Sequence, residues 1–169
     1  MLSDAEIAAV RLLGDRVAIR DTIHRYCRGV DRHDVEMIDS VFFADSVDNH
    51  GDVLCYRQEF AAWGNRLHEN ISMAHAHNIT TQLIEVSGDE AAAESYVIFV
   101  LKRKDGSTIH IGGARYLDRL ERRGGLWRIL LRRVALEWRC DVTQEQAAHR
   151  LSTLQAGTWD RQDGSYALL

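Results

Sequence analysis

The sequence predicts an α+β fold in which N-terminal helices pack on a strongly curved, mostly antiparallel sheet. Apolar residues recur at helical spacing through much of the chain up to Asn70. From His75 the pattern changes to long strand segments separated by tight-turn signals. Helices followed by a meander of strands are typical of α+β proteins. A sheet that wraps around helices leaves a cavity between the layers, the usual place for a small-molecule site.

The composition is that of one ordinary globular domain. The chain has 169 residues, 46% hydrophobic and 27% charged, and its net charge of −4 gives no footprint for nucleic acid or membrane. No segment approaches the roughly 18 uncharged apolar residues of a membrane span. We expect no signal peptide, because no apolar run follows a basic segment at the N-terminus. The three cysteines lack metal-ligand spacing, which favours reduced thiols in a cytoplasmic protein.

The first helix is expected to begin at a capping box. Ser3 and Glu6 have the required spacing. Apolar residues then recur at helical intervals as far as Val30. Gly14 leaves open whether this segment is one helix or two.

Two further helices are expected before the sheet. Asp34 is placed to cap a helix from Val35 to about Phe43. Residues 44–52 are rich in turn formers and are expected to hold a short strand and a turn. The third helix runs from Tyr56 to Asn70.

Four strands joined by tight turns are expected next. Their turns include an Asp-Gly pair, which is a strong hairpin signal. The expected strands are Ile79–Val86, Ala91–Lys102, Thr108–Arg119 and Leu126–Trp138.

The chain divides into a main domain and a tail. We assign residues 1–140 to the domain and residues 141–169 to a C-terminal segment that closes the pocket or forms an interface. That segment is expected to begin with a short helix, Gln144–Leu154, and to end loosely, because residues 157–164 are polar.

Asp31 is the residue that most needs an explanation. Steps of four back from it give Cys27, Ile23 and Ile19, so the carboxylate ends an apolar helical row. A carboxylate aimed at the core is costly unless it is paired or hydrogen-bonded. Asp31 therefore predicts a partner later in the chain.

His77 is the candidate partner. His75 and His77 start the first long strand and face the same way, in one row with Ile79. The alternative is a core histidine satisfied by its surroundings. The two histidines and Asp31 are also potential metal ligands, but no supporting motif accompanies them, so we expect no metal.

Two adjacent arginines interrupt the last strand. The residues around Arg132 and Arg133 are apolar on both faces, so one guanidinium must point into an apolar environment. Composition does not say which. A buried guanidinium needs an anion, a ligand oxygen or water. The alternative to a site role is a salt bridge to Asp31 or Glu137.

Tyr26, Asp31, His77 and one inner arginine make a coherent catalytic set. Asp31 can orient the His77 ring and stabilise its protonated form, so that neutral His77 removes a proton from the substrate. Tyr26 can donate to a developing oxyanion, and the arginine can stabilise negative charge. This chemistry requires no cofactor.

The chain resembles the SnoaL-like branch of the NTF2-like superfamily over about residues 5–138. The segments that carry the resemblance are Tyr26-x-x-Gly29-Val30-Asp31-Arg32-x-Asp34 and the stretch from His77 to Ile84. The resemblance implies a cone-shaped α+β barrel with a deep apolar pocket. It also implies a cofactor-free homo-oligomer, either a dimer or a trimer.

The resemblance places catalytic roles on four residues. The family's aspartate and histidine fall on Asp31 and His77. Tyr26 matches a tyrosine of the bile-acid 7α-dehydratase, and Arg132 matches an arginine of the hexachlorocyclohexane dehydrochlorinase. Further residues are expected to contact substrate or shape the pocket: His75, His110 (which matches a second histidine of scytalone dehydratase), Trp63, Met73, Phe99, Tyr116 and Arg133.

The predicted function is that of a cofactor-independent lyase of the dehydratase type. It would act on a small hydrophobic substrate, cyclic or aromatic, by loss of a β-leaving group. Isomerisation or retro-aldol cleavage would use the same residues. The alternative from another class is a non-catalytic protein, either a small-ligand binder or a subunit like the β subunits of ring-hydroxylating dioxygenases.

Overall fold

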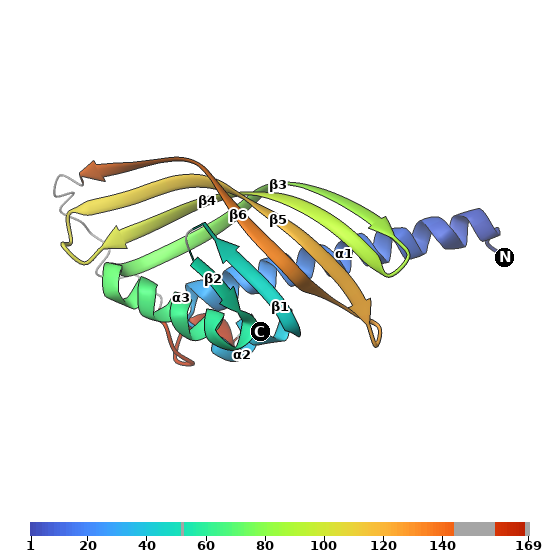
Figure 1. Cartoon of the computed structure of the whole chain (residues 1–169), viewed down its shortest axis with the longest axis horizontal. Helices are drawn as coiled ribbons and strands as arrows, with labels where there is room; N and C mark the ends of the chain where they lie inside the picture. The colour runs from blue at the N-terminus through green and yellow to red at the C-terminus, as the bar shows by residue number, and fades with distance from the viewer. Residues whose placement is uncertain (52, 144–157, 168–169) are drawn as a thin grey trace.

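The computed structural model describes residues 1–51, 53–143 and 158–167, and it has the expected α+β architecture (Figure 1). The expected helix Gln144–Leu154 lies outside these residues. Among the described residues, no helix combines the length and apolar character that a membrane crossing requires. The elements in order are α1 (Asp4–Asp31), α2 (Val35–Ser40), β1 (Phe42–His50), β2 (Val53–Tyr56), α3 (Arg57–Ile71), β3 (Ser72–Ser87), β4 (Glu90–Arg103), β5 (Thr108–Arg123), β6 (Leu126–Thr143) and the 3-10 turn Gly164–Ala167.

The six strands form one mixed sheet in the order β2-β1-β6-β5-β4-β3. All neighbouring pairs are antiparallel except β1 and β6, which are parallel. The long strands arch over the helices in Figure 1. Register shifts in the β3–β4 and β5–β6 pairings accompany this curvature, because an irregularity in pairing bends a strand. The curved, mostly antiparallel sheet confirms the predicted fold class.

α1 is a single helix, and it begins at the predicted capping box. The Glu6 backbone N–H donates to Ser3 Oγ at 3.3 Å, and the Ser3 N–H donates to Glu6 Oε2 at 2.8 Å. Gly14 does not interrupt it. The described core covers this helix only from Ile19 onward, and its N-terminal part extends beyond the sheet in Figure 1. Periodicity therefore identified the apolar face but not how much of it is covered.

α2 is shorter than predicted, and the strand after it is longer. Asp34 caps the helix as expected, since Oδ1 accepts from the Met37 N–H at 3.0 Å. The helix ends at Ser40, and Phe42 already pairs with Ile129 of β6. Pairing with a distant strand overrides the local helical pattern around Phe42 and Phe43.

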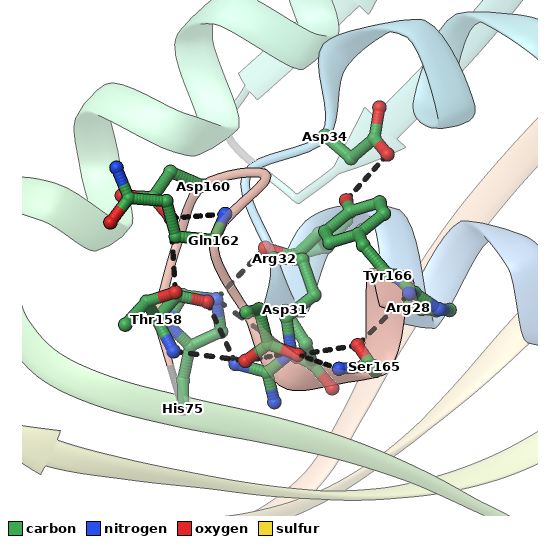
Figure 2. Close-up of polar contacts among 12 residues, drawn as sticks. Arg28, Asp31, Arg32, Asp34, His75, Thr158, Asp160, Gln162, Ser165 and Tyr166 are labelled. Carbon is green, nitrogen blue, oxygen red and sulfur yellow. Dashed lines mark hydrogen bonds and ion pairs between the residues drawn. The ribbon is translucent and has the colours of Figure 1, made fainter. Parts of the chain in front are cut away.

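Residues 158–167 are docked, which corrects the expectation of a loose end. The Tyr166 hydroxyl donates to Asp34 Oδ2 at 2.6 Å, and Arg28 Nη2 donates to Ser165 Oγ at 3.0 Å (Figure 2). The Arg28 guanidinium also lies 4.5 Å from the centre of the Tyr166 ring. The segment therefore packs against the end of α1 and the start of α2, although its polar composition did not predict this contact.

Replacing Tyr166 by phenylalanine is expected to lower the free energy of unfolding by about 1 kcal/mol, the net contribution of one intramolecular hydrogen bond. The ring and its contact with Arg28 are retained, so the change isolates the bond to Asp34. Urea unfolding measures the effect, with the exposed Tyr96→Phe as the matched control. Equal midpoints for the two variants would show that this bond does not stabilise the docked segment.

Candidate functional site

A cavity of about 540 Å³ lies between the helices and the concave face of the sheet. Its wall is mostly apolar and includes Trp63 of α3, Phe99 of β4 and Tyr116 of β5, all three predicted. Met73 is instead 55% exposed, because alternation along β3 turns it away from the buried Ser72. The expected pocket between the layers is therefore present.

Asp31 and His77 form the predicted pair, and His77 lines this cavity. Asp31 is the last residue of α1, and His77 lies within β3, which begins at Ser72. Asp31 Oδ1 lies 2.7 Å from His77 Nδ1, and Oδ2 accepts the His77 backbone N–H at 2.9 Å. Asp31 thus fixes a proton on Nδ1 and leaves the Nε2 lone pair of the cavity-lining His77 available as a base.

Tyr26 and Tyr116 also line the cavity, and both are buried. Burial raises the pKa of the Tyr26 hydroxyl well above its ordinary value, and the nearby Asp48 adds to this. Burial also raises the pKa of the Tyr116 hydroxyl well above its ordinary value, and the nearby Tyr26 adds to this. Both hydroxyls therefore stay protonated at neutral pH and can act as hydrogen-bond donors.

Arg132 is the inner arginine and has no exposed surface. Its Nε and Nη2 donate to the two oxygens of Asp118, each at 2.7 Å, so its partner is neither Asp31 nor Glu137 as considered from sequence. The guanidinium lies 4.0 Å from the Tyr26 ring centre and 4.2 Å from that of Tyr116. The Arg132 guanidinium thus packs against the rings of both tyrosines, behind the cavity wall.

Arg133 and His75 do not lie at the pocket, where they were predicted. Arg133 is exposed and lies beside Leu131 at a shallow depression elsewhere on the sheet, because neighbouring residues of β6 point to opposite faces. His75 is buried, and its Nε2 donates to the Val30 carbonyl at 3.0 Å. Neither residue lines the cavity that holds His77.

Three further histidines line the cavity, His50, His68 and His110, and two of them have an aspartate at Nδ1. His110 was predicted, and its partner is Asp141. His50 of β1 was not predicted, and its partner is the buried Asp48. The alternating row of Ser46, Asp48 and His50 could have predicted this pair, because an acidic side chain on the inner row of a strand needs a partner.

Two histidines that are shielded from water, His68 and His75, make stability depend on pH. Burial lowers the pKa of His75 to about 4 and that of His68 to about 2. In the unfolded chain both take up a proton near pH 6.5. We therefore expect the free energy of unfolding to fall as the pH drops below about 6.5, since the unfolded chain then binds more protons. Each histidine adds a slope of up to about 1.4 kcal/mol per pH unit.

Urea unfolding at a series of pH values tests this expectation. The His68→Gln variant should show a smaller slope than the wild type, and the exposed His24→Gln variant should keep the wild-type slope. The slope is the readout, so a uniform loss of stability does not obscure it. Identical slopes for all three proteins would contradict the prediction.

Comparisons with known proteins agree with this architecture. A model of the SnoaL-like domain matches residues 11–133. No curated protein matches the chain. A solved hexachlorocyclohexane dehydrochlorinase of type 2 is 20% identical, with 79% of this chain and 93% of that one covered at a TM-score of 0.73.

Two other solved structures are similar. A Novosphingobium aromaticivorans protein that is described only provisionally as a scytalone dehydratase is 16% identical, with 82% of this chain and 97% of that one covered at a TM-score of 0.70. A Mycobacterium tuberculosis protein of unknown function is 24% identical, with 80% of this chain and 76% of that one covered at a TM-score of 0.66. At these identities the likeness concerns the fold.

Proposed function

Because the chain belongs to the SnoaL-like family, we propose that it is a cofactor-independent lyase of the dehydratase type. The observation that carries this proposal is the Asp31–His77 pair, whose histidine lines a mostly apolar cavity. A histidine whose Nδ1 is held by a carboxylate is a general base at its other nitrogen. The similar dehydrochlorinase is named for an elimination, the same class of reaction.

The base step follows from the geometry of this pair. The Nε2 lone pair of His77 takes a proton from a substrate carbon, and the electron pair of the broken C–H bond forms the new double bond. The leaving group departs with the electrons of its own bond, so the reaction is redox-neutral. The Asp31 carboxylate stabilises the imidazolium that forms.

Tyr26 and His50 supply the other half of the reaction in this proposal. The Tyr26 hydroxyl donates a hydrogen bond to negative charge that develops on the substrate, and the Arg132 charge 4.0 Å behind its ring strengthens that donor. His50 lies in the same cavity and can protonate a leaving hydroxyl. Elimination places charge at both ends of the substrate, and the cavity has a polar group for each.

The substrate class follows from the wall of the cavity. A volume of about 540 Å³ is within the ordinary range of small-molecule pockets. Aromatic and aliphatic side chains predominate, so we propose a hydrophobic cyclic or aromatic molecule that carries a hydroxyl or halide β to an acidic C–H. Isomerisation and retro-aldol cleavage remain within reach of the same base.

Hydrogen–deuterium exchange tests the proposal. A panel of hydrophobic β-hydroxy and β-halo carbonyl or cyclic compounds is incubated with the protein in D₂O, and products are identified by mass spectrometry. We expect deuterium incorporation, or loss of water or halide, with the wild type and with the exposed control His24→Ala. His77→Ala should fold normally and lack both activities. Tight binding of a compound without exchange or turnover would favour a binding protein or a subunit instead.

A further inference from the structure

Three imidazoles from three different elements meet beside the Asp31–His77 pair. His33 comes from the turn after α1, His68 from α3 and His75 from β3. The ring centres of His68 and His75 are 4.3 Å apart, and those of His33 and His75 are 5.3 Å apart. One nitrogen from each ring lies within 4.8 Å of the other two. The proposed reaction makes no use of this cluster.

Two nitrogens of the cluster lack ordinary partners. His33 Nε2 and His68 Nδ1 are shielded from solvent and have no hydrogen-bond partner among the described residues. An unpaired polar atom away from water costs free energy, so two of them in one cluster need an explanation. Imidazole nitrogens with free lone pairs are ready ligands for a metal ion.

His75 already has the arrangement of a metal-bound histidine. Its Nε2 donates to the Val30 carbonyl at 3.0 Å, which places the free lone pair on Nδ1. Nδ1 lies 3.5 Å from Ser72 Oγ, and that hydroxyl donates to the His68 carbonyl at 2.8 Å instead. Histidines that bind metal usually donate their second N–H to a carbonyl or carboxylate in this way.

From these contacts we propose that His33, His68 and His75 bind one divalent transition-metal ion, with Zn²⁺ the first candidate. Imidazole suits zinc, copper, nickel and iron, and three protein ligands with one open position form a known zinc arrangement. In a tetrahedral site with Zn–N bonds of about 2.0–2.1 Å, the nitrogens are about 3.3 Å apart. Binding therefore draws the three rings closer by small side-chain rotations.

The docked tail segment covers the cluster. Trp159 from the docked tail segment stacks on His33 with ring centres 4.2 Å apart and also lies 5.2 Å from His75. His75 lies beside this segment in Figure 2. The ion would join the turn after α1, α3 and β3 under an aromatic cover.

The sequence alone indicated no metal, because the three ligands are far apart along the chain and follow no ligand motif. Asp31 and His77, the other potential ligands of this region, are engaged with each other. The proposed site therefore differs from the Asp31–His75–His77 set that strand spacing offers. It also stands independently of the proposed lyase activity.

Zinc titration of the full chain, treated with chelator and then dialysed, tests the proposal. By calorimetry we expect one Zn²⁺ per chain and a rise in the unfolding temperature with added zinc. His68→Gln and His33→Gln should each weaken binding by more than about 100-fold, beyond the roughly 10–100-fold cost of a typical outer-shell change. The controls His24→Gln, which is exposed, and His77→Gln should bind as the wild type does.

X-ray absorption of the zinc-loaded wild type provides a readout that does not depend on any variant. We expect a first shell with three imidazole nitrogens. Fewer than three imidazoles, the absence of stoichiometric binding, or a loss of affinity in His77→Gln equal to that in His68→Gln would overturn the proposal.

Discussion

Replacing Asp31 by asparagine is expected to lower kcat of the proposed elimination by about 10²–10⁴, the usual contribution of a positioned base. Both oxygens of Asp31 face N–H donors, the ring Nδ1 and the backbone N of His77. An amide has one oxygen, so it must present an NH₂ group to one of these donors. The His77 ring then loses its orientation or its tautomer, and the imidazolium loses its counter-charge.

Kinetics of the single and double variants decide whether the two residues act as one unit. His77→Ala with Asp31→Asn should be no slower than His77→Ala alone, because removing the base leaves nothing for Asp31 to orient. The exposed Asp21→Asn is the matched control and should keep the wild-type rate. KM should change less than kcat. Multiplicative losses in the double variant would show that Asp31 acts independently of His77.

Replacing Arg132 by methionine is expected to lower the free energy of unfolding by about 3–5 kcal/mol, the cost of breaking a buried ion pair from one side. Neither Arg132 nor Asp118 has an exposed side chain, and their two hydrogen bonds are both 2.7 Å long. The variant leaves the buried Asp118 carboxylate without its cation. It also removes the cation between the rings of Tyr26 and Tyr116.

Urea unfolding of three variants measures this cost and its origin. Arg133→Met, the exposed neighbour on the same strand, should change stability by no more than about 0.5 kcal/mol. Arg132→Met combined with Asp118→Leu should recover much of the loss, because no unpaired charge then remains buried. If the double variant were as unstable as Arg132→Met alone, the loss would come from packing against the tyrosines rather than from the charge.

Local patterns in the sequence predicted most of the fold. The capping box at Ser3, the cap at Asp34 and the glycine turns between the long strands depend on neighbouring residues, so they could be read without tertiary information. The boundary of α2 was wrong because β6 pairs with Phe42, and that strand is far away in the chain. The oligomeric state and the cytoplasmic location stay predictions.

By itself the sequence determined that Asp31 needs a partner, that His77 shares a strand face with Ile79, and that one of two adjacent arginines must be buried. These conclusions follow from helical and strand periodicity and from the cost of burying charge. Only the tertiary structure decided that Arg132 is the buried one. It also paired Arg132 with Asp118, docked residues 158–167 on Asp34, and gathered His33, His68 and His75. The physical reason is that spacing determines which side of an element a residue occupies, whereas its partner depends on how the elements pack.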